Sequence, residues 1–306
     1  MKNTVLVMIS TYNGQEKIIK QVESIINQQD VDVKIKIRDD GSNEETLSII
    51  SGLVEKYPKT IEIVFGENIG WKRSFIELLY SSDLKYDYYA FSDQDDIWLD
   101  HKLINCIRLM ERDENKGIKM AHCNSLSVDS ELNERKEQER RIAYPSNYKA
   151  AIATEYFQGC GMVWNKEAMC RIKKYKPVNT DLAHDYWVGL ICYLFGKVYF
   201  IEKPQFYHIR YADNSSADGN VYKGRLRRLT SLMKGKSVYM NPSKDLVVGY
   251  RKYLESRQEI VEFLNKIQCY RQNRIIKLSL IMDKQFVRPS KLATIIFKYN
   301  ILSNRY

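Results

Sequence analysis

Three carboxylates that could hold a metal ion lie within four positions of the chain. Asp93, Asp95 and Asp96 occur in the segment FSDQDDIW at residues 91–98, directly after the aromatic run Tyr86–Phe91, which predicts a buried strand. Like charges at the end of a strand repel one another unless a cation compensates them. Mg²⁺ commonly binds proteins through one or two carboxylates together with substrate phosphates. The cluster therefore indicates a nucleotide-diphosphate site, with a solvated acidic turn as the alternative.

Three further polar clusters follow predicted strands in the first hundred residues. Apolar runs and alternation predict strands over 5–9, 31–37, 61–65 and 86–91, and helical spacing predicts helices over 18–26, 44–56, 71–82 and 103–110. The polar clusters are Ser10–Gly14, Asp39–Ser42, Asn68–Gly70 and the acidic Asp93–Asp96. This βαβ alternation predicts a mainly parallel sheet covered on both faces. Because ligands bind at the carboxyl ends of such strands, we expect the four clusters to meet at one edge.

The pattern after residue 110 is less regular. Phe157–Trp164 is predicted to be a strand whose glycines permit close backbone approach, followed by a helix over His184–Phe195 and a strand over Lys197–Ile201. The mixed-charge stretch Glu131–Arg141 is typical of a solvated helix or loop. After about residue 216 apolar residues recur at helical spacing, which predicts a helical C-terminal region.

Composition limits the class of protein. The 306 residues are 44% hydrophobic, enough for one large domain or two. No apolar run reaches the roughly 18 residues of a transmembrane helix, and the first residues lack the apolar segment and cleavage site of a signal peptide. The six cysteines show no metal-binding spacing, and most lie in apolar segments, as reduced thiols of a cytosolic protein do.

The net charge of +10 is unevenly distributed along the chain. Residues 221–306 hold 19 Lys and Arg against 5 Asp and Glu, a net charge of +14, whereas residues 1–220 have a net charge of −4. A near-neutral body therefore carries a basic tail. Its apolar stripes and cations predict helices that rest on anionic lipids, with an oligomerisation domain as the alternative.

Five motifs occur in a fixed order along the chain: STYN at 10–13, DDGS at 39–42, NIG at 68–70, SDQDDIW at 92–98 and HD at 184–185. Together they resemble the family 2 inverting glycosyltransferases, whose GT-A fold is a Rossmann-like mixed α/β sheet flanked by helices. The SDQDDIW segment is most similar to rhamnosyltransferase-type members. The resemblance covers roughly residues 3–215, and the C-terminal helical region lies outside it.

The resemblance implies a metal site. It assigns the cation to Asp95, the last residue of the D-x-D pair, and places Asp93 near the ribose or the donor sugar. Asp93 or Asp96 would alternatively cap the following helix. Many members carry Tyr-Arg-x-His near the end of the domain, but this chain reads YHIR at 207–210. Arg210 cannot ligate a metal, although it could bind a diphosphate, and His208 would have to turn inward to become the third ligand.

The resemblance also implies a nucleotide site. It points to Thr11, Tyr12, Asn13 and Asp40, with the Tyr12 ring stacked on the base and the Asp40 carboxylate accepting the imide N–H. Asp39 is alternatively a turn-forming residue, because Asp-Gly sequences are ordinary turn chemistry.

The remaining assignments concern phosphate binding and catalysis. Lys72 or Arg73, at a predicted helix start, would meet a phosphate, with a solvated basic helix face as the alternative. Asp185 occupies the place of the family's acidic residue near the acceptor, which implies the catalytic base. An ordinary acidic residue at a helix N-terminus is the alternative. His184 would tune or replace Asp185, or it is structural.

We therefore expect a cytoplasmic, Mn²⁺- or Mg²⁺-dependent inverting glycosyltransferase, with a catalytic domain over 1–215 and a basic helical region over 216–306 that binds the inner face of the membrane or forms a homo-oligomer. The resemblance favours dTDP-rhamnose as donor, with a UDP-hexose as the alternative, and a surface polysaccharide or lipid-linked glycan as acceptor. A nucleotidyltransferase is more distant, because Ser10–Gly14 supplies no glycine-rich basic loop. A nucleic-acid-binding role does not explain the acidic cluster.

Overall fold

The computed structural model describes residues 2–134, 144–154, 157–179, 182–210 and 242–306. The chain divides into two compact units. The first unit comprises residues 1–142, 156–173 and 183–211, and the second comprises 143–155, 174–182 and 212–306. The predicted boundary between residues 215 and 216 lies outside the described residues.

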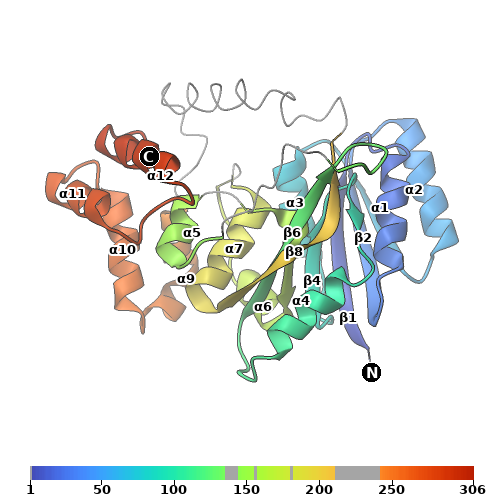
Figure 1. Ribbon diagram of the computed structural model, residues 1–306, viewed down its shortest axis with the longest axis horizontal. Coiled ribbons are helices and arrows are strands. Elements are labelled where there is room, and N and C mark those ends of the chain that lie inside the picture. The colour runs from blue at the N-terminus through green and yellow to red at the C-terminus, as the bar shows by residue number, and fades with distance from the viewer. Residues whose placement is uncertain (1, 135–143, 155–156, 180–181, 211–241) are drawn as a thin grey trace. The chain divides into compact units, whose positions relative to one another are not determined.

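The described part of the first unit is built on an eight-stranded mixed sheet (Figure 1). Its strands are β1 (Asn3–Thr11), β2 (Val31–Asp40), β3 (Ile61–Gly66), β4 (Tyr88–Ser92), β5 (Ile97–Trp98), β6 (Lys119–Val128), β7 (Met162–Asn165) and β8 (Lys197–Ile209). They lie in the order β3-β2-β1-β4-β7-β6-β8-β5. The first four strands are parallel, β7 is antiparallel to both of its neighbours, and β5 is antiparallel to β8. The predicted mixed α/β fold is thus confirmed.

Helices cover both faces of this sheet. They are α1 (Lys17–Ile26), α2 (Glu44–Lys56), α3 (Trp71–Ser81), α4 (Lys102–Glu111), α6 (Lys166–Ile172) and α7 (His184–Phe195). Successive residues of β1 point to opposite faces of the sheet. Val5, Val7 and Ile9 point to one face, where they share a core cluster with α1, α2 and α4. Leu6 and Met8 point to the opposite face, where they are also buried and where α3 packs against β1.

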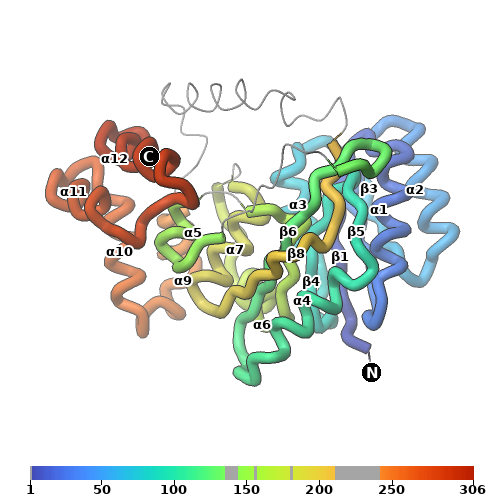
Figure 2. The backbone as a smooth tube through the Cα atoms, in the orientation of Figure 1, coloured from blue at the N-terminus to red at the C-terminus, as the bar shows by residue number. Residues whose placement is uncertain are grey.

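The register of the parallel strands brings their carboxyl ends to one edge. Thr11 of β1 lies beside Asp39 of β2, Asp40 lies beside Gly66 of β3, and Ile9 lies beside Ser92 of β4. Figure 2 traces the chain from β4 into β5, and the acidic loop is this connection. The edge predicted to bind ligand therefore carries the end of every parallel strand from β1 to β4.

Two segments differ from the sequence-based prediction. The predicted strand over Phe157–Trp164 is wrong in its first half, where a 3₁₀ turn covers Gly159–Gly161 and the strand begins only at Met162. A Cβ at Gly161 would lie 2.7 Å from the backbone oxygen of Cys123 on β6. The 3₁₀ turn therefore packs against β6 at a distance that leaves no room for a side chain at this position. The strand β6 was not predicted, and β8 extends eight residues beyond its predicted end at residue 201.

The second unit is helical in its described part, as predicted for the C-terminal region. Its helices are α5 (Tyr148–Thr154), α9 (Ser243–Leu254), α10 (Gln258–Cys269), α11 (Arg274–Met282) and α12 (Lys291–Leu302). It has its own aromatic core, in which the ring of Phe286 lies 5.0 Å from that of Phe263 and 4.8 Å from that of Phe297. Within the described residues, no helix is both long enough and apolar enough to cross a bilayer.

Candidate active site

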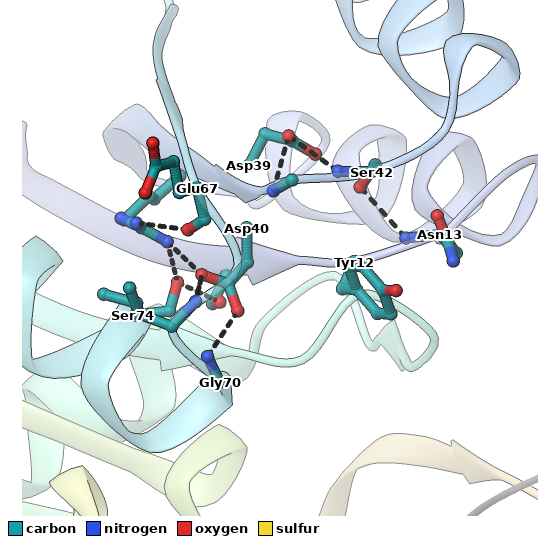
Figure 3. Close-up of polar contacts among 12 residues, drawn as sticks. Tyr12, Asn13, Asp39, Asp40, Ser42, Glu67, Gly70 and Ser74 are labelled. Atoms are coloured by element: carbon teal, nitrogen blue, oxygen red, sulfur yellow. Dashed lines mark hydrogen bonds and ion pairs between the residues drawn. The ribbon is translucent and has the colours of Figure 1, made fainter.

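Hydrogen bonds join the polar clusters at the strand ends. The Asn13 backbone N–H donates to Ser42 Oγ at 3.0 Å, and Asn13 Oδ1 accepts the Asn43 backbone N–H at 2.9 Å, so the loops after β1 and β2 hold each other. Figure 3 shows this contact beside Tyr12. Asp40 forms hydrogen bonds with the segment before α3. The acidic loop forms hydrogen bonds with the end of β1. The structure thus brings the four clusters together.

Gln94, which the sequence did not single out, fixes the acidic loop to β1. Its Oε1 accepts the Thr11 hydroxyl at 2.7 Å and the Tyr12 backbone N–H at 3.0 Å, while its Nε2 donates to the Tyr12 backbone oxygen at 3.3 Å. Thr11 is buried, and its hydroxyl is used in this contact. The only signal in the sequence was the position of Gln94 between two aspartates.

Tyr12 presents its ring at this edge. The side chain is 49% exposed, although its backbone is held on both sides by Gln94. An exposed aromatic ring suits stacking against a nucleobase. Because the backbone of Tyr12 is already fixed, this residue would lose little conformational entropy on binding. The structure thus places the Tyr12 ring at the predicted edge, and its stacking on a base stays a prediction.

Asp40 is engaged by protein donors on both carboxylate oxygens. Oδ1 pairs with the Arg38 guanidinium and accepts the Ile69 N–H at 3.0 Å, and Oδ2 accepts the Gly70 N–H at 2.9 Å. Arg38 also donates to Ser74 Oγ at 3.0 Å (Figure 3). Asp40 therefore ties the end of β2 to the start of α3. A nucleobase contact by Asp40, as predicted, would use an oxygen that already accepts a protein hydrogen bond.

Asp39 is the neighbouring acceptor at this edge. Its Oδ2 accepts the backbone N–H groups of Gly41 and Ser42, each at 3.0 Å, which confirms the turn-forming alternative. Its Oδ1 is buried and has no hydrogen-bond partner among the residues that the structure describes. A buried acceptor without a donor is unfavourable, so a ligand N–H would stabilise it. The sequence named the turn as the alternative role of Asp39 and gave no signal for this second oxygen.

The acidic loop gathers ligand atoms suited to a cation. The carboxylates of Asp93 and Asp96 and the Cys160 thiol lie within 4.8 Å of one another. The Cys160 thiol donates to Asp93 Oδ2 at 2.8 Å. Burial and the neighbouring Asp96 raise the pKa of Asp93 to about 6, and the same two causes raise the pKa of Asp95. Carboxylates that resist ionisation in this way fit a bound divalent cation, although Asp95, the predicted ligand, is not among the three clustered groups.

His208 points toward this cluster from β8. Its Nδ1 lies 2.8 Å from Asp96 Oδ1, and Asp96 is almost fully buried. Burial would lower the pKa of His208, but the contact with Asp96 outweighs it and the pKa is raised. A carboxylate on Nδ1 leaves Nε2 as the nitrogen able to ligate. Arg210 follows one residue after β8, with its backbone N–H on the Val128 oxygen at 2.9 Å.

Asp185 lies in the first turn of α7 and is buried. Its Oδ1 accepts the Tyr186 backbone N–H at 2.7 Å. Burial, with a smaller contribution from Asp93, raises the pKa of Asp185 to about 7, whereas Lys72 opposes the shift. These effects place Asp93 and Lys72 within electrostatic reach of Asp185. A carboxylate with a pKa near neutrality suits a general base.

His184 is a packed aromatic residue. Its ring stacks on Phe75 at 3.9 Å and meets the edge of Phe91 at 4.5 Å. Burial lowers its pKa to about 3, so it is neutral at physiological pH. A Cβ at Gly159 would lie 3.0 Å from His184 Nε2, so the glycine lets the 3₁₀ turn approach the start of α7. The structural alternative for His184 fits these contacts.

The chain is similar to known glycosyltransferases in sequence. Residues 6–178 match the family described as glycosyl transferase family 2. The chain is 31% identical over 243 residues to the dTDP-rhamnosyl transferase RfbG of Shigella flexneri, covering 72% of this chain and 78% of that protein.

Solved structures share the fold at low sequence identity. TarS residues 1–349 of S. aureus, in complex with UDP-GlcNAc, has a TM-score of 0.57 at 14% identity, covering 99% of this chain and 91% of that one. The mannosyltransferase PcManGT of Pyrobaculum calidifontis, with GDP-Man and Mn²⁺, has a TM-score of 0.54 at 14% identity, covering 100% and 89%. The chain therefore belongs to glycosyl transferase family 2 and has the GT-A fold that its motifs predicted.

Proposed function

We propose that this glycosyltransferase inverts the configuration at the anomeric carbon of the sugar it transfers. We also propose that Asp185 is its catalytic base. The observation that carries the proposal is the buried Asp185 carboxylate, whose pKa is raised to about 7, within electrostatic reach of the acidic loop. A base with that pKa is partly ionised at neutral pH and still binds a proton strongly.

In this mechanism the acceptor hydroxyl oxygen attacks the anomeric carbon on the face opposite the nucleotide. The new carbon–oxygen bond forms as the bond from the anomeric carbon to the diphosphate oxygen breaks. The hydroxyl proton passes to the Asp185 carboxylate, and the nucleoside diphosphate leaves with the electron pair. Burial of Asp185 limits competition by water for that proton.

The donor would occupy the edge formed by β1, β2 and β4. The exposed Tyr12 ring supports stacking of the base. The buried Oδ1 of Asp39, which has no hydrogen-bond partner among the described residues, supports recognition of a base N–H beside the predicted Asp40. We further propose that Thr11 and Asn13 shape this pocket, because their side chains hold the acidic loop and the β2 loop.

The diphosphate would lie between the start of α3 and the end of β8. Lys72 is in the first turn of α3, where a helix N-terminus favours an anion. Arg210 follows β8 and could bind two phosphate oxygens at once.

The cation would be Mn²⁺ or Mg²⁺, held by the acidic loop. Asp95 is the ligand that the resemblance assigns, Asp93 and Asp96 supply the clustered carboxylates, and His208 offers Nε2. When bound, the cation would neutralise the charge that develops on the departing diphosphate. PcManGT was solved with Mn²⁺, which supports this class of cation.

We propose dTDP-rhamnose as the donor. The support is the 31% identity to a protein named dTDP-rhamnosyl transferase. A UDP-hexose is the second candidate, because TarS was solved with UDP-GlcNAc. Family membership favours glycosyl transfer over nucleotidyl transfer. The proposed acceptor is a hydroxyl group of a surface polysaccharide or lipid-linked glycan precursor, reached from the cytoplasm.

A donor panel tests these proposals. Purified protein would be incubated with dTDP-rhamnose, UDP-glucose, UDP-GlcNAc and GDP-mannose, each with Mn²⁺, Mg²⁺ or EDTA, and the released nucleoside diphosphate identified. We expect release from dTDP-rhamnose with either cation and none with EDTA. Asp95→Ala should abolish release, whereas Asp32→Ala, at an exposed surface carboxylate, should not. Full activity in EDTA would overturn the metal proposal, and preference for another donor would overturn dTDP-rhamnose.

A further inference from the structure

Two helices of the second unit expose rows of large apolar side chains. On α11 they are Ile275, Leu278 and Met282, and on α12 they are Leu292, Ile295, Tyr299 and Leu302, with exposed fractions between 52% and 79%. The spacings of three, four and seven residues place each row on one face of its helix. We call these seven side chains the α11–α12 face.

The opposite sides of both helices are packed inside the unit. Leu280 of α11 and Phe297 and Ile301 of α12 are buried in its core. Hydrogen bonds from Lys277 Nζ to the Leu302 oxygen at 3.4 Å and from Lys298 Nζ to the Leu280 oxygen at 2.6 Å join the helices as an antiparallel pair. The α11–α12 face is therefore additional to the apolar core. Grouped exposed apolar side chains of this kind mark an interaction surface.

The charge around this face indicates its partner. Residues 271–306 contain eight Lys and Arg and one acidic residue, Asp283. That carboxylate already pairs with Lys149 at 3.0 Å. Arg271, Arg274, Lys284 and Lys291 are exposed. Apolar side chains bordered by cations are the pattern of helices that lie in the interface of an anionic bilayer.

We infer that the α11–α12 face docks on an anionic lipid bilayer, with its apolar side chains entering the headgroup boundary and its cations meeting lipid phosphates. A second copy of the chain is the less favourable occupant, because two such faces would bring like charges together. The inference stands on the second unit alone and does not need the proposed donor or base. A lipid-linked acceptor would then be met at the same membrane surface.

Vesicle flotation with the full-length protein tests this docking. Vesicles would be made of phosphatidylcholine alone or mixed with phosphatidylglycerol, at low and high salt. We expect binding to the mixed vesicles that weakens at high salt, since charge attraction is screened over about 8 Å at physiological ionic strength. The double variant Leu292→Glu/Ile295→Glu should lower the partition constant at least about tenfold, or about 1.4 kcal/mol.

A matched control separates this effect from a general effect of added negative charge. Val248→Glu makes the same kind of change at a side chain that is 62% exposed on α9, outside the face, and should bind vesicles more strongly than the double variant. Arg274→Glu/Lys291→Glu should weaken binding to mixed vesicles. Circular dichroism would verify that each variant is folded, and light scattering would give its oligomeric state.

Three results would overturn the docking. In the first, the wild-type protein would not float with mixed vesicles at low salt. In the second, the double variant would float as well as the wild type. In the third, Val248→Glu lowers binding as much as the double variant. If light scattering shows that Leu292→Glu/Ile295→Glu splits an oligomer while vesicle binding is unchanged, the face joins copies of the chain instead.

Discussion

At the scale of single residues, burial decides the chemistry of Asp185. A carboxylate removed from water is harder to ionise, and here burial raises its pKa from 3.8 to about 7. Because the folded state holds this proton more tightly than the unfolded state, the group favours folding at low pH. That contribution is lost as the pH rises from about 4 to about 7. The proposed role as catalytic base requires the opposite, ionised form.

The pH dependence of turnover should therefore show an acidic limb near pH 7. We expect kcat, measured with saturating donor and acceptor, to fall tenfold for each unit of pH below that value, because the protonated carboxyl cannot accept the hydroxyl proton. A profile that stays level down to pH 5 would argue against Asp185 as the base.

Replacing the base should affect the chemical step and not donor binding. Asp185→Asn is expected to lower kcat by about 10²–10⁴, since the amide keeps the shape but cannot take a proton. Calorimetry should give an unchanged Kd for the nucleoside diphosphate. Asp30→Asn, at an exposed ion pair with Arg108, is the matched control and should leave kcat unchanged. Weaker donor binding with normal turnover would assign Asp185 to the donor site.

Gln94 holds the backbone of Tyr12, whose ring we propose stacks on the donor's base. Gln94→Met keeps the length of the side chain but removes the contacts with Thr11 and Tyr12. Losing these hydrogen bonds should cost about 1–2 kcal/mol, so the Kd for the nucleoside diphosphate should rise about 5- to 30-fold. Gln29→Met is the control, because the exposed Gln29 side chain donates to the nearby Asn27 backbone oxygen and lies outside the site. Equal affinity of Gln94→Met and wild type would remove Gln94 from the site.

At the scale of elements, the buried pair of Arg38 and Asp40 joins the end of β2 to the start of α3. Asp40 accepts the Ile69 and Gly70 backbone N–H groups, which would otherwise be unpaired at the helix start. Gly70 has a φ of +82°, which glycine adopts without strain. The position of Lys72 in the following turn therefore depends on this pair.

Removing one partner of the pair should destabilise the protein. Asp40→Ala leaves the Arg38 guanidinium buried without its carboxylate, which typically costs about 3–5 kcal/mol in the free energy of unfolding. Urea denaturation measures this cost. Asp32→Ala breaks the half-exposed pair with Lys34 and should cost less than about 1 kcal/mol. A similar loss in both variants would mean that Asp40 does not anchor α3.

Local patterns predicted elements where one physical signal dominated. The helix over 44–56 was predicted with its observed ends from its helical spacing, and in the structure the Asn43 side chain caps it by accepting the Thr46 backbone N–H. The strand β6 escaped prediction, since KMAHCNSLSV mixes polar and apolar residues without alternation although most are buried. The strand-end clusters and the acidic loop were visible in the sequence. The contacts of Gln94 and the buried, unpartnered oxygen of Asp39 within the described residues were not, because they depend on side-chain directions between distant segments.

At the scale of the whole molecule, two cores and an uneven charge distribution divide the chain. The first unit is centred on the sheet, and the second has the aromatic cluster around Phe286. Residues 221–306, which belong to the second unit, have a net charge of +14, which exceeds the +10 of the whole chain because residues 1–220 have a net charge of −4. Separate cores permit separate unfolding.

Calorimetric unfolding should show two transitions. Leu264→Ala, in the core of the second unit, should lower the midpoint temperature of one transition, and Ile107→Ala, in the core of the first, should lower that of the other. Each substitution should reduce the free energy of unfolding of its unit by about 2–5 kcal/mol. A nucleoside diphosphate with Mn²⁺ should raise only the transition that Ile107→Ala lowers. A single transition that both variants shift equally would show that the units unfold together.

The order of the strands has a consequence for synthesis of the protein. Thr11, near the start of the sequence, lies at the edge where the parallel strands end. The last strand, β8, completes this edge because it pairs with β5 and β6 and places His208 beside Asp96. Roughly 200 residues separate the first contribution from the last. At about 5–20 residues per second, a ribosome needs about 10–40 s to cover that interval. A nascent chain can therefore form the parallel strands early, yet the proposed nucleotide site stays incomplete until β8 has emerged.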